Sequence, residues 1–268
     1  MILIFGSNGM LGNYITRVLN DIHYVIPLSR TDFDIEIDPW TKLFKLLDMY
    51  RPTVIVNCSG LIPQRNIDLN KPYYRINAVF PHKLQFYCDN TRHPCKLIHI
   101  TTDCVFSGKK GNYHEWNCPD PGTIYGRSKY FGEPWDACVI RTSIIGEEIV
   151  NKKSLLEWVR AQKHIAGYLN YIWNGVTCLK LSEIVKEIIK TNCFWKGIRH
   201  IHSPRNISKF ELCNMINDVY ELDIEIIKSN AEVSTDRTLM TLYPMFSIEP
   251  IEDQLKKQKE FQLCAINT

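Results

Sequence analysis

The chain has 268 residues, 45% of them hydrophobic and 23% charged, so it can bury one large core together with a smaller lobe. Its net charge is only +3, and Lys and Arg are scattered, which argues against a nucleic-acid partner. No segment approaches ~20 uninterrupted apolar residues, and MILIFG at the start is not a signal segment, so we expect a cytoplasmic protein with no membrane partner.

The early part of the chain alternates short β-rich runs with longer helical stretches. We expect strands at Ile2–Phe5, Tyr24–Leu28, Thr53–Cys58, Lys96–Thr101 and Cys138–Arg141, with helices at about 10–20, 40–50, 71–90 and 123–133. This order is typical of a Rossmann-type, doubly wound parallel α/β sheet, whose ligands bind at the carboxyl ends of the strands. We therefore expect a dinucleotide-binding domain at about residues 1–143.

The first strand is followed at once by Gly6-Ser7-Asn8-Gly9-Met10-Leu11-Gly12 and an amphipathic helix. In such a loop the first glycine permits a tight turn, the second lets a pyrophosphate approach the backbone, and the third lets helix and strand pack closely. A bare structural turn is the alternative. The loop predicts cofactor contacts at Gly6, Asn8, Gly9, Met10, Leu11 and Gly12.

The second strand ends in Ser29-Arg30, where many NAD-preferring sites carry an acidic residue for the adenosine ribose. A hydroxyl and a cation suit a 2′-phosphate better. Arg30 could instead be an ordinary solvated loop residue. The sequence therefore favours NADPH and leaves NADH possible.

The fourth strand and the next helix carry the candidate catalytic groups. Tyr125 and Lys129 are one helical turn apart, so they share a helix face, and an ammonium nearby would lower the pKa of a tyrosine toward the working range. Thr102, at the carboxyl end of the fourth strand, could hydrogen-bond a substrate oxygen. Surface packing and β propensity are the alternatives for these residues taken singly.

Beyond about residue 143 the regular alternation of strands and helices ends. Helices are expected near 152–163, 178–191, 207–220 and 250–262, and strands at 198–202 and 223–228. We expect residues 144–268 to form a smaller, mostly helical substrate-binding lobe, with some segments returning to the large sheet. The ten cysteines form no Cys-x-x-Cys pair and the eight histidines no metal-ligand spacing. Reduced thiols and no metal site are expected.

With these motifs, the chain resembles the extended short-chain dehydrogenase/reductase superfamily and, within it, the dTDP-4-dehydrorhamnose reductase-like family. The resemblance covers roughly residues 1–180 and rests on five ordered motifs: GSNGMLG, TTDCVF, YGRSK with its following GE, VIRTS and WNGVT. It implies a reductase that uses NADPH to reduce the C4 keto group of a nucleotide-linked 4-keto-6-deoxyhexose in deoxysugar biosynthesis, without a metal.

The resemblance also assigns roles to individual positions. It implies a catalytic triad of Thr102, Tyr125 and Lys129. It implies cofactor contacts at Gly9, Met10, Leu11, Asp34, Ile35, Cys58, Ser59 and Gly60, and at Asn77, which matches an asparagine that supports the lysine. Tyr125 and Lys129 are also expected to contact the cofactor, the lysine at the nicotinamide ribose. Substrate-side positions are implied at Asp103, Arg141, Trp173 and Asn174, although the last two could equally be packing and turn residues.

At two positions the sequence differs from related enzymes, and these differences disfavour two of the activities found among them. Nucleotide-sugar 4,6-dehydratases carry a glutamate where this chain has Cys104, so dehydration is disfavoured. Bifunctional 3,5-epimerase/4-reductases carry a cysteine where the segment 66–70 ends in Asn70, so we expect epimerisation to be done by another protein. The segments Gln64-Arg65, 156–158 and WNGVT resemble reductases of UDP-linked 2-acetamido-2,6-dideoxyhexoses more than those of dTDP-rhamnose.

Two other functions stay open. One is a nucleotide-sugar epimerase with bound NAD, and the other is a regulatory subunit that binds NADP without turnover, like the reductase-like subunit of methionine adenosyltransferase. Net consumption of reductant separates the reductase from both. The sequence also leaves a homodimer open.

Overall fold

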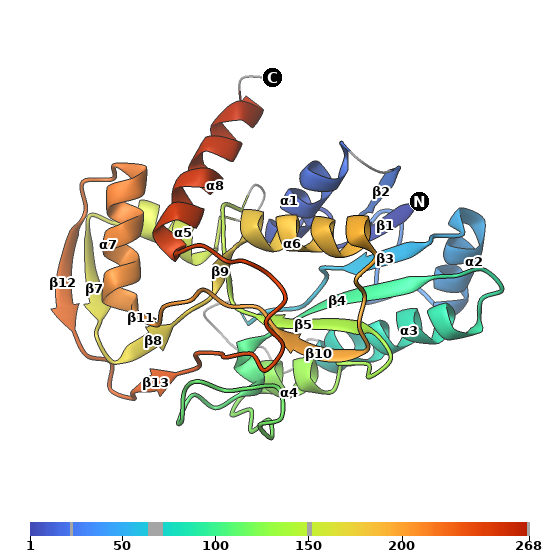
Figure 1. The fold of residues 1–268 in the computed structure, drawn as a ribbon, viewed down its shortest axis with the longest axis horizontal. Coiled ribbons are helices and arrows are strands. Elements are labelled where there is room, and N and C mark those ends of the chain that lie inside the picture. Colours follow the sequence, from blue (N-terminus) through green and yellow to red (C-terminus); the bar gives the residue numbers. More distant parts are fainter. Residues whose placement is uncertain (22–23, 64–71, 149–151, 267–268) are drawn as a thin grey trace.

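A six-stranded parallel sheet forms the centre of the protein, whose structure is a computed structural model describing residues 1–21, 24–63, 72–148 and 152–266. The strand order is β10-β5-β4-β3-β1-β2 (Figure 1). The strands are β1 (Ile2–Phe5), β2 (Val25–Leu28), β3 (Val54–Asn57), β4 (Lys96–Thr102), β5 (Cys138–Thr142) and β10 (Gly197–His200). Because all pair in parallel, their carboxyl ends meet at one edge of the sheet.

Apolar residues in the strands alternate between two cores, because successive strand side chains point to opposite faces. In β1, Ile2 and Ile4 enter one core, whereas Leu3 and Phe5 enter the other. The first core lies under α1 (Met10–Leu19) and α6 (Cys178–Thr191), and the second under α2 (Trp40–Tyr50) and α3 (Phe80–Asn90). The sheet is thus covered on both faces, and the predicted doubly wound Rossmann-type fold is confirmed.

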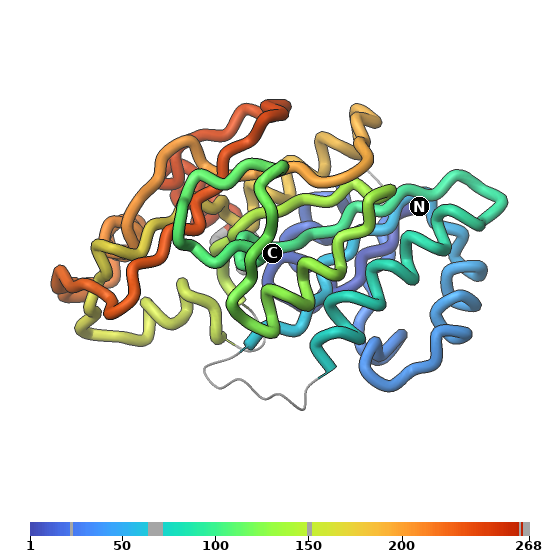
Figure 2. The backbone as a smooth tube through the Cα atoms, turned by 90° about the horizontal axis from the view of Figure 1, so that it is seen from below, coloured from blue at the N-terminus to red at the C-terminus, as the bar shows by residue number. Residues whose placement is uncertain are grey.

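The strands and helices of this large lobe closely follow the expected ranges, but the second half of the chain does not stay apart from it. Both α6 and β10 belong to the large lobe, and β10 adds the edge strand beside β5. The chain therefore leaves the large lobe after β5, returns, and leaves again. In the view from below, the blue N-terminal segments and the orange-to-red C-terminal ones lie largely toward opposite ends (Figure 2).

The small lobe contains helices at the expected places together with several short strands. Its helices are α5 (Leu155–Arg160) and α7 (Lys209–Tyr220). Its strands are β7 (His164–Tyr168), β8 (Tyr171–Trp173), β11 (Ile207–Ser208), β12 (Glu225–Ser229) and β13 (Thr235–Asp236), which form sheets ordered β11-β8-β13 and β12-β7. β12 matches the strand expected at 223–228, whereas the other four were not predicted; three of these, β8, β11 and β13, have too few residues for a clear period-two pattern. Within the described residues, no helix is both long and apolar enough to cross a membrane.

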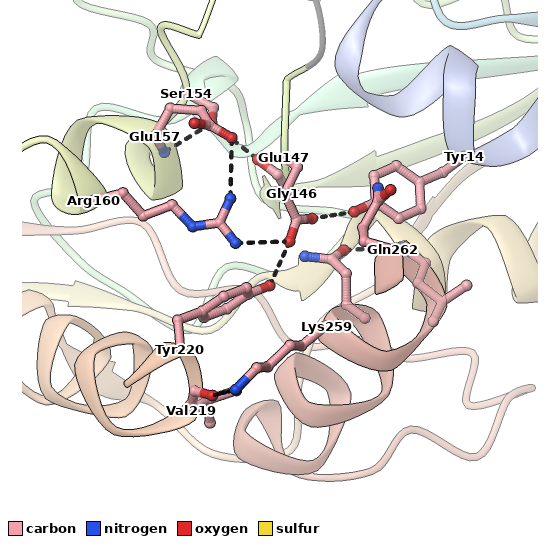
Figure 3. Close-up of polar contacts among 12 residues, drawn as sticks. Tyr14, Gly146, Glu147, Ser154, Glu157, Arg160, Val219, Tyr220, Lys259 and Gln262 are labelled. Carbon is pink, nitrogen blue, oxygen red and sulfur yellow. Dashed lines mark hydrogen bonds and ion pairs between the residues drawn. The ribbon is translucent and has the colours of Figure 1, made fainter. Parts of the chain in front are cut away.

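The two lobes meet around the carboxylate of Glu147, which follows the short strand β6 (Ile144–Ile145); β6 pairs with β9 (Val176–Thr177). Tyr14 of α1 and Tyr220 of α7 both donate hydrogen bonds to this carboxylate, the second at 2.7 Å (Figure 3). Arg160 of α5 adds an ion pair at 3.4 Å. The C-terminal helix α8 (Ile251–Ile266) packs against both α6 and α7. One buried acid thus joins elements of both lobes.

Candidate active site

The glycine loop turns sharply between β1 and α1. Gly6 has a φ of +78°, a conformation that suits glycine, and its carbonyl accepts a hydrogen bond from the Gly9 N–H at 3.0 Å. A Cβ on Gly12 would lie 2.1 Å from the Gly6 carbonyl oxygen. The absence of that side chain lets α1 approach the turn, so that the amino end of α1 follows the loop directly and can face an anion.

A pocket of about 380 Å³ opens beside this loop, along the carboxyl ends of β1, β2 and β3. Its lining includes ten of the positions expected to bind cofactor: Gly6, Asn8, Gly9, Ser29, Arg30, Asp34, Ile35, Cys58, Ser59 and Gly60. The other three loop positions belong to α1. Leu11 sends its side chain into the core, and Gly12 packs on the turn, so Met10, Leu11 and Gly12 can act on a ligand through the backbone at the helix start.

The far end of the pocket would face the adenosine part of a dinucleotide. Arg30 is exposed there, whereas the Ser29 hydroxyl donates to Asp32 at 2.8 Å. Asp32 does not line the pocket, and its pKa is lowered mainly by hydrogen bonds from Ser29. Glu36 also lines the pocket and was not singled out from the sequence, because an acid in a polar turn carries no distinctive signal. Arg30 is the cation that this end offers.

Thr102 and Tyr125 lie together at the carboxyl end of β4. The Thr102 hydroxyl donates to Asp103 at 3.1 Å and accepts from the Cys104 N–H, while Tyr125 comes from the first turn of α4 (Ile124–Tyr130). Burial, with smaller contributions from Cys104 and Asp103, raises the pKa of Tyr125. A hydrogen bond with Thr102 lowers it in part. The phenol therefore stays protonated at neutral pH.

Lys129 is placed differently from the expectation that it lowers the tyrosine pKa. Its ammonium donates to the Ile100 carbonyl at 3.0 Å, and it lies close to the backbone of Gly60 at the end of the large-lobe pocket. Burial lowers the pKa of Lys129 to about 8, against the opposing effect of Glu133. Thr102, rather than Lys129, is the group that lowers the pKa of Tyr125.

Asn77 occupies a π-helical turn, Arg75–Val79, which leads into α3. Its side chain exchanges two hydrogen bonds with the backbone of Leu61, at 2.7 and 2.9 Å, and donates to Ser128 at 3.0 Å. The asparagine thus ties the loop after β3 to the helix that carries Lys129. It acts on the lysine by holding its helix and the facing loop.

A second pocket, of about 310 Å³, lies between the end of β4 and the small lobe. Asp103 and Trp173, both expected on the substrate side, line it together with Cys104. Two cations that the sequence did not single out, Lys209 and Arg237, also line it. Aromatic and apolar side chains form most of the remaining wall: Leu155, Trp158, Ile165, Tyr168, Tyr171 and Ile172.

The two pocket cations are held by their surroundings. Lys209 places its ammonium 5.0 Å from the centre of the Trp173 ring, and burial lowers its pKa to about 8. Arg237 donates to the Phe106 carbonyl at 2.9 Å and to the Tyr171 hydroxyl at 3.1 Å. Lys209 begins a helix that was expected near 207–220, and Arg237 lies in a segment for which no helix or strand was expected, so only the folded chain brings the two cations to Asp103.

Arg141 and Asn174 occupy buried structural positions instead of the expected substrate-side ones. Arg141 is 1% exposed and forms two hydrogen bonds with Glu133, at 2.8 and 2.6 Å. Asn174 is 4% exposed and hydrogen-bonds both backbone groups of Leu239. Neither lines the second pocket. A strand-end arginine and a turn asparagine satisfy neighbouring buried groups here, because polar groups removed from water need partners.

Two sequence arguments concern residues outside those that the structure describes. These are the Gln64-Arg65 pair and the segment 66–70 that was compared with bifunctional epimerases. Of the segment 156–158, Trp158 lines the second pocket, Leu156 is buried and Glu157 pairs with Arg160.

The family model described as RmlD substrate binding domain matches residues 1–239. Over 265 residues the chain is 26% identical to the spore coat polysaccharide biosynthesis protein SpsK of Bacillus subtilis, covering 94% of this chain and 90% of that protein. It is 30% identical over 259 residues to the probable low-salt glycan biosynthesis reductase Agl14 of Haloferax volcanii, covering 87% and 85%.

Among solved structures, a dTDP-4-dehydrorhamnose reductase of Bacillus anthracis in complex with NADP is similar to this fold. Its TM-score is 0.81 at 20% identity, and the match covers 97% of this chain and 98% of that one. A hypothetical dTDP-4-dehydrorhamnose reductase of Sulfolobus tokodaii matches with a TM-score of 0.75 at 26% identity, covering 89% and 91%.

Proposed function

We propose a function from the premise that this chain belongs to the RmlD substrate binding domain family, among the dTDP-4-dehydrorhamnose reductase-like proteins. It is an NAD(P)H-dependent oxidoreductase and, at the level its relatives support, a nucleotide-sugar 4-ketoreductase of deoxysugar biosynthesis. Its substrate, by our proposal, is a nucleotide-linked 4-keto-6-deoxyhexose, and its reductant is NADPH, as the bound NADP of the Bacillus anthracis structure supports.

The large-lobe pocket fits a dinucleotide. The Gly6–Gly12 approach leaves the loop backbone open to a pyrophosphate, and Arg30 at the far end offers a cation to a 2′-phosphate. At the near end, Lys129 and Gly60 adjoin the place where a nicotinamide ribose would sit. When bound there, NADPH supplies a hydride to the substrate.

The protein's own groups can manage the accompanying proton. Tyr125 stays protonated at neutral pH, so it can donate a proton to the oxygen of a reduced carbonyl. Thr102 hydrogen-bonds this phenol and orients it, and Lys129 can hold ribose hydroxyls from its buried position. These roles for the three residues are part of the proposal.

The second pocket supports a nucleotide-sugar substrate. A nucleotide sugar carries a diphosphate, and Lys209 and Arg237 put two cations into a pocket whose other walls are largely apolar and aromatic. Asp103 and Trp173 would contact the sugar side. Within this class we propose a UDP-linked 2-acetamido-2,6-dideoxyhexos-4-ulose, with dTDP-4-dehydrorhamnose as the competing substrate.

The observation that carries the proposal is the meeting of Thr102 and Tyr125 at a strand end, between the pocket beside the glycine loop and the pocket that holds Lys209 and Arg237. The test is to incubate the protein with NADPH and a panel of 4-keto-6-deoxy nucleotide sugars and to identify products by NMR. We expect one NADPH to be oxidised per product hydroxyl formed. A panel that yields no NADPH oxidation would contradict the proposal.

A variant pair tests the proton donor. Tyr125→Phe should lower turnover by about 100-fold or more while changing NADPH affinity only a few fold, because the phenol acts in the chemical step. Tyr130→Phe is the matched control, since Tyr130 belongs to the same helix but is 38% exposed. Equal turnover by Tyr125→Phe would remove Tyr125 from the mechanism.

The two competing functions are separated by the same assay. An epimerase with bound NAD would convert a nucleotide sugar without net NADPH oxidation, and a regulatory subunit would bind NADP without forming any product. Two relatives named reductases, those of Aggregatibacter actinomycetemcomitans and Haloferax volcanii, match 81% and 87% of this chain, whereas methionine adenosyltransferase 2 subunit beta of Danio rerio matches 47% of it. The reductase is therefore the function that we propose.

A further inference from the structure

Two cysteines face each other at the edge of the sheet opposite the candidate active site. Cys88 lies near the end of α3, and Cys95 directly precedes the first residue of β4. Their sulfur atoms are 3.4 Å apart, with the Cys88 thiol placed to donate toward Cys95. This edge carries the amino ends of the strands, whereas the candidate catalytic groups stand at the carboxyl ends.

The pair is accessible through a pocket. A cavity of about 240 Å³ is lined by both cysteines, and Lys96, Lys196, Asp89 and Asp136 place charges of both signs around it. Cys88 is only partly buried, whereas Cys95 is 8% exposed. A small zwitterionic molecule can therefore reach Cys88 first and Cys95 only from within the pocket.

We propose that Cys88 and Cys95 form a reversible redox site, in which a low-molecular-weight disulfide such as glutathione disulfide converts the two thiols into an intramolecular disulfide. Cys88, as its thiolate, attacks one glutathione sulfur and releases the first glutathione thiolate. Cys95 then gives up its proton, attacks the mixed disulfide at Cys88 and releases the second. The protein loses two electrons and two protons, and one glutathione disulfide becomes two glutathione thiols.

The geometry suits this closure. A disulfide requires sulfurs about 2.05 Å apart, so the pair must approach by a little more than 1 Å. Cys88 stands in the last turn of α3, which ends at Asn90, and residues 91–95 between α3 and β4 form no helix or strand, so this short connection, which includes Cys95, can absorb the movement. Cys138 lines the same pocket and is the rival partner.

The environment of Cys88 sets the rate. The contact with Cys95 and burial raise the pKa of Cys88, and Asp89 on the same helix raises it further. Lys96 of β4 and Lys196, which is paired with Asp136, are the cations around the pocket. The thiolate is therefore scarce at neutral pH, and oxidation should accelerate close to tenfold for each unit rise in pH.

The experiment treats the full chain with excess glutathione disulfide, alkylates the remaining thiols and maps them by mass spectrometry. We expect a Cys88–Cys95 crosslink lighter by two hydrogen atoms, reversed by dithiothreitol and formed faster at higher pH. Cys88→Ser should abolish the crosslink, whereas Cys118→Ser, which alters an exposed cysteine elsewhere, should leave it unchanged.

Several results would overturn the proposal. They are full alkylation of both cysteines after treatment, a crosslink from Cys95 to Cys138, or a mixed glutathione disulfide at Cys88 that never closes. The map of the unaltered protein decides between these results and the expected one even where the Cys88→Ser variant does not fold. The outcome does not depend on reductase activity, so it tests the redox site apart from the proposed function.

Discussion

Replacing Gly12 by alanine would push α1 away from the glycine turn. The new Cβ would lie 2.1 Å from the Gly6 carbonyl oxygen and 2.8 Å from the Cα of Ser7, where contacts below 3.0 Å essentially never occur. Because these neighbours are backbone atoms, no side chain can rotate away, and the helix start must shift by roughly 1 Å. Overpacking of this kind costs about 1–3 kcal/mol of the free energy of unfolding.

The same shift moves the helix N–H groups that we expect to face the pyrophosphate. Hydrogen bonds to charged groups contribute about 1.5–3 kcal/mol, so misplacing one should weaken NADPH binding about 10- to 100-fold. Fluorescence titration with NADPH and urea unfolding measure the two effects. Gly122→Ala is the matched control, because its Cβ meets nothing within 4 Å. Wild-type affinity and stability in the Gly12→Ala variant would refute the steric reasoning.

Three further outcomes follow from the site. Arg30→Ala should weaken NADPH binding at least about tenfold more than NADH binding, because only NADPH carries the 2′-phosphate; titration that leaves the cofactor ratio unchanged would remove this role. Glu133→Gln should destabilise the fold by about 3–5 kcal/mol in urea unfolding, since it leaves Arg141 charged and buried, and a loss below about 1 kcal/mol would contradict this. Because burial lowers the pKa of Lys129 to about 8, its ammonium is lost as pH rises through that value, so turnover with saturating substrate should fall there; a profile flat from about pH 7 to about pH 9.5 would show that the charge is not needed.

The large lobe could be predicted from sequence because its signals are local. The apolar run Ile2–Phe5 matches β1, and the glycine loop directly follows it, so strand, turn and helix are specified within about 20 residues. In the small lobe the same kind of local signal predicted α5, α7 and β12, but the shortest strands lacked it. Its strands β8, β11 and β13 have two or three residues each, and pairing between segments far apart in the chain defines them.

The residues of the candidate site also fall into two groups, those that local sequence signals identified and those that they did not. Tyr125 and Thr102 were found because motif spacing and strand position identify them. Lys209 and Arg237 were missed because nothing in their neighbourhoods distinguishes a pocket cation from a surface one. The predicted effect of Lys129 on Tyr125 was wrong for a geometric reason, since a shared helix face does not determine where a long side chain ends, and this one reaches the Ile100 carbonyl.

The shared acid Glu147 has a consequence for how the molecule moves. A hinge motion that widened the cleft would have to separate Tyr14 from Tyr220 and so strip a buried carboxylate of a phenol on at least one side. Large rigid-body motions of one lobe relative to the other are therefore disfavoured. The space between the lobes is already formed before a ligand binds. A ligand then enters and leaves through smaller movements of side chains and connecting segments around the opening between the lobes.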